Sequence, residues 1–136
     1  MYDPKIKVLI VDDMLTMRKI ITRAFKLIGF ENLVEASDGQ KAWEILGGSD
    51  HSIDLIVSDW NMPNCTGFDL LKRVRGDGRF KALPFLLLTA ESDGNQVSVA
   101  VKAGVDNYII KPFTPEILKE KLAEAYAKSS KRINSF

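Results

Sequence analysis

The chain has 136 residues, of which 46% are hydrophobic and 27% charged, and its formal net charge is +1. This size suits one globular domain, and the near-zero charge gives no long-range attraction to nucleic acid or to an anionic membrane. No apolar run approaches the ~20 residues that span a bilayer, residues 1–7 lack the apolar stretch of a secretory signal, and a single cysteine, Cys65, excludes an internal disulfide. We therefore expect a cytoplasmic protein that binds neither nucleic acid nor membrane.

The first part of the chain predicts two strand–helix units. Residues 8–11 form an unbroken Val/Leu/Ile run typical of a buried strand, and apolar residues at helical spacing follow between positions 20 and 28. Gly29 is placed to end that helix. A weaker strand is expected at 33–36, after which Ser37-Asp38-Gly39 can cap a second helix.

The middle of the chain predicts a third unit. Residues 47–50 are rich in glycine and predict a turn, and His51, which follows them, is expected to be solvated. The apolar run 55–58 predicts a third strand. Gly67 opens a third helix with apolar residues on one face, and the glycines of 76–78 interrupt it.

Two further units complete the pattern. The apolar run 85–88 predicts a fourth strand, and the shorter helix after it can end at Gly104. A fifth strand is expected at 108–110. Thr114 followed by Pro115 is a strong helix start, because the threonine oxygen can cap the helix and proline lacks an N–H that would have no partner there.

Regular strand–helix alternation indicates an α/β fold of the (βα)5 kind. Parallel neighbouring strands need crossover connections, usually helical, and strands covered on both faces are apolar without alternation. We therefore expect a doubly wound, five-stranded parallel sheet. Residues 1–128 would form one domain, and 129–136, which lack apolar periodicity, a flexible C-terminal tail.

Polar residues follow four of the five predicted strands. They are Asp12, Asp13, Asp59, Thr89 and Lys111. In open α/β sheets, ligands bind beyond the carboxyl ends of the strands, so these side chains are expected to meet there. Carboxylate oxygens are the ligands that Mg²⁺ prefers, and three neighbouring carboxylates would repel one another without a cation. The pattern predicts a site that holds Mg²⁺ and a phosphoryl group together, with a backbone carbonyl near Asn61 as a further ligand.

Asp59 is the candidate nucleophile of this site. A carboxylate can attack phosphorus and form an acyl phosphate, and phosphoryl transfer chiefly requires positioning and compensation of charge on the phosphoryl oxygens. Mg²⁺, the Lys111 ammonium and the Thr89 hydroxyl could each take one oxygen. Paired aspartates such as Asp12-Asp13 are also common helix caps, and capping is a possible second role for one of them.

Four motifs carry a family resemblance. They are Val11-Asp12-Asp13, Ser58-Asp59-Trp60-Asn61-Met62-Pro63, Thr89-Ala90-Glu91 and Tyr108-Ile109-Ile110-Lys111-Pro112-Phe113. In combination they resemble the motifs of receiver domains of two-component response regulators, and the chemotaxis type most of all. The similarity covers about residues 5–128. It implies the flavodoxin-like strand order 2-1-3-4-5 and a usually cis peptide bond between Lys111 and Pro112.

The resemblance also implies roles for the site residues. Asp59 would accept phosphate from a histidine kinase, and Asp12, Asp13, Asp59 and the Asn61 carbonyl would bind Mg²⁺, with Mn²⁺ as a substitute. Thr89 and Lys111 would bind the phosphoryl group. Thr89 and Tyr108 would form the switch, Thr89 moving toward the phosphoryl group and Tyr108 turning inward. Asn61 and Glu91 would help to set the rate of dephosphorylation.

The partners implied are a chemotaxis-type histidine kinase, an output target such as a flagellar motor switch protein, and in some systems a phosphatase. The protein would be a monomeric signalling switch, not a metabolic enzyme, and would present its output through helix 4, strand 5 and helix 5. Tyr108 and Lys121 match that output face. Residues 92–95 (Ser-Asp-Gly-Asn) lack the lysines that motor-binding relatives carry there.

Two other functions compete with this interpretation. The chain could relay phosphate to another protein, or could be the receiver of a longer regulator with another output. A hydrolytic phosphatase of the haloacid-dehalogenase type also combines a nucleophilic aspartate with Mg²⁺, threonine and lysine. Such an enzyme needs an acid two residues after the nucleophile, where this chain has Asn61, which cannot protonate a leaving group.

Overall fold

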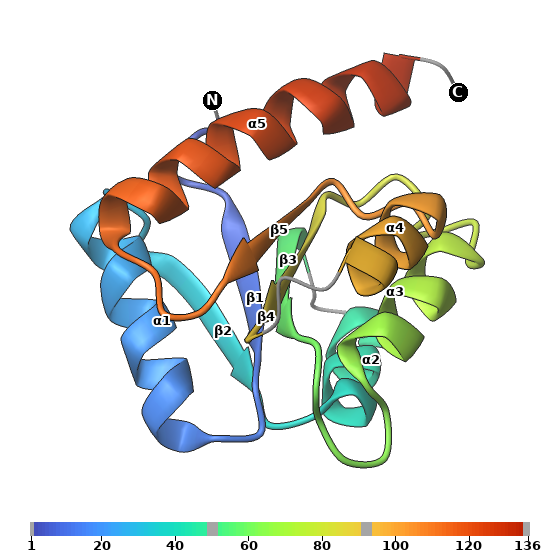
Figure 1. The fold of residues 1–136 in the computed structure, drawn as a ribbon, viewed down its shortest axis with the longest axis horizontal. Coiled ribbons are helices and arrows are strands. Elements are labelled where there is room, and N and C mark those ends of the chain that lie inside the picture. Colours follow the sequence, from blue (N-terminus) through green and yellow to red (C-terminus); the bar gives the residue numbers. More distant parts are fainter. Residues whose placement is uncertain (1, 49–51, 91–93, 135–136) are drawn as a thin grey trace.

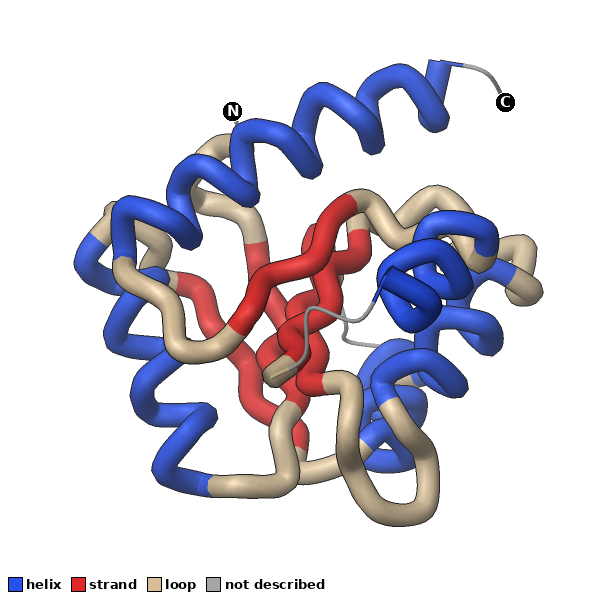
Figure 2. The backbone as a smooth tube through the Cα atoms, viewed as in Figure 1, coloured by secondary structure: helices blue, strands red, loops and turns tan. Residues whose placement is uncertain are grey.

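Strands and helices alternate along the chain in the computed structural model, which describes residues 2–48, 52–90 and 94–134 (Figures 1 and 2). The strands are β1 (Lys7–Val11), β2 (Asn32–Ala36), β3 (Ile53–Asp59), β4 (Phe85–Thr89) and β5 (Asn107–Ile110). The helices are α1 (Leu15–Leu27), α2 (Gly39–Gly47), α3 (Gly67–Arg75), α4 (Gly94–Lys102) and α5 (Pro115–Asn134). His51, Glu91, Ser92 and Asp93, on which the sequence placed expectations, lie outside the described residues.

The five strands form one parallel sheet in the order β2-β1-β3-β4-β5, which confirms the fold class and the strand order. All strands run in the same direction, so their carboxyl ends lie along one edge of the sheet. β1 and β3 are central neighbours, and β3 is followed by β4. The residues that follow β1, β3, β4 and β5 are therefore brought to one side of the molecule.

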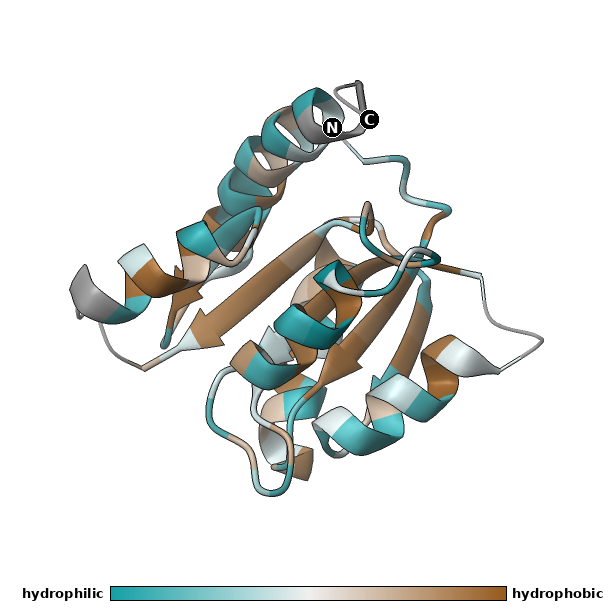
Figure 3. Cartoon of the chain, turned by 90° about the vertical axis from the view of Figure 1, so that its right-hand side faces the viewer, coloured by the Kyte–Doolittle hydropathy of each residue, from teal (hydrophilic) through white to brown (hydrophobic). Residues whose placement is uncertain are grey.

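Helices cover both faces of the sheet. α1 and α5 lie on one face, and α2, α3 and α4 on the other (Figure 1). Side chains alternate between the two faces along a strand, so each strand contributes to two separate hydrophobic cores. In β1, Val8 and Ile10 pack toward α1 and α5, whereas Leu9 and Val11 pack toward the other helices. Figure 3 shows apolar strands between helices of mixed polarity, the arrangement expected of a doubly wound sheet.

The predicted helix boundaries agree with the structure at several positions. The side chain of Asp38 accepts a hydrogen bond from the Lys41 N–H at 2.8 Å, and the Thr114 hydroxyl accepts one from Ile117 at 3.2 Å. Gly29 and Gly104 adopt φ angles of 107° and 97°. These capping contacts satisfy backbone groups that a helix end leaves without partners.

The last helix extends into the segment that the sequence analysis assigned to a tail. The sequence predicted a flexible segment from residue 129, whereas α5 continues to Asn134. The continuation has an anchor at the other end of the chain: the Tyr2 hydroxyl lies 3.0 Å from the hydroxyl of Ser129, which is 2% exposed, and the Tyr2 ring packs edge-on against Tyr126 at 5.1 Å. Sequence periodicity within α5 could not reveal a partner that lies more than a hundred residues away in the chain.

A buried ion pair fixes the end of the sheet opposite the strand carboxyl ends. The Arg75 guanidinium lies 3.2 Å from the Asp106 carboxylate and donates to the carbonyls of Gly104 (2.9 Å) and Leu83 (2.6 Å). Asp106 also accepts a hydrogen bond from the Phe85 N–H at 2.8 Å. One arginine at the end of α3 thus joins the segments that lead into β4 and β5.

Asp106→Asn is expected to lower the free energy of unfolding by about 2 kcal/mol, because the bond to Arg75 loses its charge in a buried position. The isosteric change keeps an acceptor for the Phe85 N–H. Urea unfolding measures the effect, with Glu124→Gln as control, since Glu124 pairs with Lys121 at 3.7 Å on the surface and such pairs contribute little. Equal stability of the two variants would contradict a structural role for the buried pair.

Candidate functional site

The end of β1 supplies two carboxylates in different environments. Asp12 is fully buried and Asp13 is exposed. The Asp12 N–H donates to the Ala36 carbonyl at 3.1 Å, and its Oδ1 accepts from the Met14 N–H at 2.9 Å. α1 begins after Met14, which provides no side-chain cap. Neither aspartate is therefore the N-cap residue of α1, and Asp12 shapes the turn while its Oδ2 is turned toward the site.

The end of β3 supplies the central carboxylate. Asp59 is 6% exposed, and the backbone on both sides of its loop is fixed by hydrogen bonds from the Trp60 N–H to the Leu88 carbonyl (2.8 Å) and from the Gly67 N–H to the Trp60 carbonyl (2.9 Å). α3 consequently starts directly against the end of β3. The Asp59 side chain is held on a rigid support, as a reacting group requires.

Lys111 reaches this carboxylate from the segment after β5. Its Nζ lies 2.7 Å from Asp59 Oδ1 and 3.6 Å from Asp12 Oδ2. The Lys111 N–H donates to the Thr89 carbonyl at 2.8 Å, and the peptide bond to Pro112 is cis, as the resemblance implied. The ammonium thus bridges carboxylates from β1 and β3.

The remaining predicted residues differ in burial and in the element that carries them. Thr89 ends β4 and is 2% exposed, and Asn61 is exposed in the loop after Asp59. Tyr108 is half-buried on β5, with the Lys121 Nζ 5.3 Å from its ring centroid. Tyr108 and Lys121 therefore belong to a separate surface between β5 and α5.

The negative charges of the acidic cluster repel one another. One carboxylate oxygen from each of Asp12, Asp13 and Asp59 lies within 4.8 Å of the others. Burial raises the pKa of the Asp12 carboxyl above its usual value, and the charges of Asp59 and Asp13 raise it further, against the opposing effects of the Met14 N–H and Lys111. Asp12 Oδ2 is buried and has no hydrogen-bond partner among the described residues.

This donor set fits a hard divalent cation. Oxygen ligands from several carboxylates at one point are what Mg²⁺ prefers, and a cation would satisfy the buried Asp12 oxygen and relieve the repulsion. Lys111 supplies only part of the balancing charge, because one ammonium faces three carboxylates. The residues Asp12, Asp13 and Asp59 can therefore hold a metal ion.

Without divalent cation at neutral pH, Asp12→Asn is expected to raise the melting temperature by roughly 3 °C. A carboxyl group whose pKa is raised by folding destabilises the native state above that pKa, so the difference should shrink as the pH falls toward the ordinary value of 3.8. Added Mg²⁺ should stabilise the wild type more than the variant. Thermal melts with and without Mg²⁺ measure this, and a metal-free variant less stable than the wild type would contradict the repulsion.

Two further residues support the site, and no structural role was predicted for either. Arg18 on α1 donates from Nη1 to the Asp12 carbonyl at 2.6 Å, and its Nε pairs with Glu35 at 3.2 Å. The Trp60 ring stacks on Phe68 of α3 with centroids 5.4 Å apart and an interplanar angle of 4°. The helical spacing of α1 placed Arg18 off the apolar stripe, but nothing in the sequence pointed it at a carbonyl of the preceding loop.

Comparison with known proteins adds independent information. The family model described as response regulator receiver domain matches residues 8–123. The chain is 48% identical to the chemotaxis protein CheY1 of Helicobacter pylori over 116 residues, 85% of this chain and 93% of that protein. It is 48% identical to the chemotaxis protein CheY of Pseudomonas aeruginosa over 120 residues, 88% of this chain and 95% of that protein. The solved structure of the chemotaxis response regulator CheY4 of Vibrio cholerae superposes with a TM-score of 0.79 at 33% identity, covering 89% of this chain and 98% of that chain.

None of the described helices is long and apolar enough to cross a membrane.

Proposed function

The chain belongs to the response regulator receiver domain family, and on that premise we propose that it is a phosphorylation-operated switch whose phosphoacceptor is Asp59. One observation carries the proposal: the buried Asp59 carboxylate lies 2.7 Å from the Lys111 ammonium and beside two further carboxylates. A nucleophile, a cation for the phosphoryl oxygens and a metal-binding cluster thus occupy one edge of the sheet.

In the proposed reaction, an Asp59 oxygen attacks the phosphorus of a donor phosphohistidine. The new bond is an acyl phosphate, the phosphorus–nitrogen bond of the donor breaks, and its electron pair stays on the leaving imidazole. The Lys111 ammonium and the Thr89 hydroxyl take phosphoryl oxygens. Asp12, Asp13, Asp59 and the Asn61 carbonyl would hold Mg²⁺ or Mn²⁺, which when bound supplies positive charge to the phosphoryl group.

The proposed readout is a change of surface around α4, β5 and α5. Thr89 ends β4 next to Ile110 of β5 in the sheet register. A movement of the Thr89 side chain toward the phosphoryl group would therefore change the packing near Tyr108 on the same strand. Tyr108 is half-buried, and in the proposed switch its ring would turn inward. Phosphorylation would then bias a two-state element, and Asn61 and Glu91 would tune how long the acyl phosphate lasts.

The proposed pathway is chemotaxis signalling in the cytoplasm. The relatives at 48% identity are named chemotaxis proteins, which supports a chemotaxis-type histidine kinase as donor and an output target such as a flagellar motor switch protein. A phosphatase would be a third partner. The chain would act as a monomer and catalyse only its own phosphorylation and dephosphorylation.

Trp60 fluorescence tests the proposal on a Trp43→Phe background, which leaves Trp60 as the reporter beside Asp59. Beryllofluoride mimics a phosphoryl group on a carboxylate, and its addition with Mg²⁺ is expected to change the fluorescence saturably. A chelator should prevent the change. A protein that remains folded and binds Mg²⁺ but does not respond to beryllofluoride would contradict the proposed switch.

A further inference from the structure

The edge of the sheet at β2 is open. β2 pairs only with β1 among the described strands. The Ala36 carbonyl faces β1, since it accepts the Asp12 N–H at 3.1 Å. Backbone groups of successive residues in a strand point to opposite sides, so those of Leu33 and Glu35 face outward. No described residue hydrogen-bonds to the outward N–H of either.

The opposite edge of the sheet differs. On β5, the Tyr108 N–H is satisfied by the Asn107 side chain at 2.9 Å, and the Asn107 amide donates to the Lys121 carbonyl at 3.0 Å. Proteins usually protect edge strands with lysine, proline or a bulge, because unpaired edges recruit other strands. β2 (Asn-Leu-Val-Glu-Ala) has none of these, and its one charge, on Glu35, is paired with Arg18.

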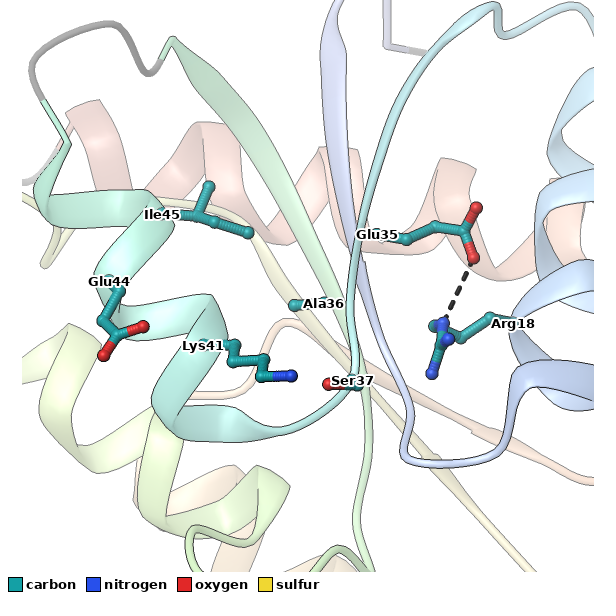
Figure 4. Close-up of a pocket in the computed structure, with 7 residues that line it drawn as sticks. All are labelled: Arg18, Glu35, Ala36, Ser37, Lys41, Glu44 and Ile45. Atoms are coloured by element: carbon teal, nitrogen blue, oxygen red, sulfur yellow. Dashed lines mark hydrogen bonds and ion pairs between the residues drawn. The ribbon is translucent and has the colours of Figure 1, made fainter.

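Grooves flank this edge on both faces of the sheet. A groove of about 560 Å³ lies at the carboxyl end of β2 (Figure 4). On the α2 side it is lined by Lys41, Glu44 and Ile45, next to Ala36 and Ser37, and on the other side by Glu35 and Arg18. On the α1 side, a groove of about 360 Å³ is lined by three exposed cations at helical spacing together with Thr22 and Glu35; the cations are Lys19, Arg23 and Lys26. Thr22 Oγ1 is buried there without a hydrogen-bond partner among the described residues.

The charges that line the two grooves indicate what kind of chain can bind at this edge. Lys19, Arg23 and Lys26 form no ion pair with any described residue, so an incoming carboxylate would meet unneutralised cations. A second copy of this chain fits poorly, because antiparallel pairing of two β2 strands about a two-fold axis places the cations of both α1 helices side by side. On the α2 side of the larger groove the charges of Lys41 and Glu44 balance, and Ala36 and Ile45 can receive apolar side chains.

We propose that the free edge of β2 docks an extended acidic segment of a partner protein, which adds to the sheet as a sixth strand. Its backbone would pair with the outward N–H and C=O groups of Leu33 and Glu35. Side chains of an added strand alternate between the two faces, so acidic residues would face α1 and apolar residues α2. This surface is separate from the phosphoacceptor and from the β5–α5 face, so docking there leaves both free.

A fluorescein-labelled peptide of alternating glutamate and valine tests the proposal by anisotropy. The wild type is expected to bind it with a Kd of roughly 10–100 μM, weakening as salt rises, and to ignore the matching lysine–valine peptide. Glu35→Pro removes an outward N–H without removing a hydrogen bond to β1. Glu35→Ala is its control, because it also loses the ion pair with Arg18 but keeps the N–H. The proline variant should bind the peptide about tenfold more weakly than the alanine variant. The double variant Lys19→Glu, Arg23→Glu should weaken binding and abolish its salt dependence.

Amide proton exchange on the wild type provides a second readout, which does not depend on the proline variant folding. Peptide binding should protect the amides of Leu33 and Glu35 and leave Asn107 unchanged. Absence of binding, equal binding by the proline and alanine variants, or protection elsewhere would overturn the proposal. Concentration-dependent dimerisation through β2 without peptide would assign the edge to a second copy instead.

Discussion

Asp59→Asn is expected to abolish phosphorylation of the protein by acetyl phosphate, with a loss of at least about a thousandfold in rate. The amide has nearly the size of the carboxylate, so the loop and the start of α3 keep their hydrogen bonds. It lacks the anionic oxygen that attacks phosphorus, and the group that lies 2.7 Å from the Lys111 ammonium loses its negative charge. Intact-protein mass spectrometry after incubation with acetyl phosphate and Mg²⁺ measures the phosphorylated fraction.

Asp54→Asn provides the matched control for this variant. Asp54 lies near the other end of the same strand, β3, where its exposed carboxylate accepts a hydrogen bond from the Lys7 N–H at 2.9 Å. Phosphorylation of this control should equal that of the wild type. Undiminished phosphorylation of Asp59→Asn would show that another residue accepts the phosphoryl group.

Gly67→Ala is expected to destabilise the fold by about 3 kcal/mol, one of the larger costs of a single added methyl group. A Cβ at this position would lie 2.1 Å from the Asp59 carbonyl oxygen and 2.9 Å from Leu87 Cδ2. The obstacle is backbone, which cannot rotate away as a side chain can. Either α3 or the end of β3 must shift, and a shift of β3 would move the Asp59 carboxylate as well.

Urea unfolding and Trp60 fluorescence measure the two consequences of Gly67→Ala separately. Gly47→Ala is the control: a Cβ there meets nothing within 4 Å, and alanine in a helix is favoured over glycine by up to about 1 kcal/mol. The control should therefore be at least as stable as the wild type and respond normally to beryllofluoride. Wild-type stability of Gly67→Ala would mean that α3 does not abut β3 as closely as described.

The sequence was most informative where one physical rule governs many residues. Buried parallel strands must be apolar along their length, so runs such as 85–88 were recognisable, and the polar residues after them could be assigned to one edge of the sheet. Asp12, Asp13, Asp59 and Lys111 do meet there. The strand order itself came from the family resemblance, because alternation alone does not determine which strands are neighbours.

Features that depend on long-range contacts could not be predicted from the sequence. The close approach of Gly67 to Asp59, and the anchoring of Ser129 by Tyr2, join residues whose relation is set only by the packed fold. The bond from Arg18 to the Asp12 carbonyl is shorter in range, yet a helical pattern gives the face of a residue and not its partner. The length of α5 beyond residue 128 was not predicted for the same reason.

Chemical mapping of the phosphorylated residue tests the central claim most directly. The protein is phosphorylated by a phosphorylated chemotaxis-type histidine kinase with Mg²⁺, and borohydride then reduces the acyl phosphate to an alcohol, which converts an aspartate to homoserine. Peptide mass spectrometry is expected to find homoserine at position 59 and aspartate at positions 12 and 13. Homoserine at position 12 or 13, or at no position while the kinase has lost its phosphate to the chain, would contradict Asp59 as the phosphoacceptor.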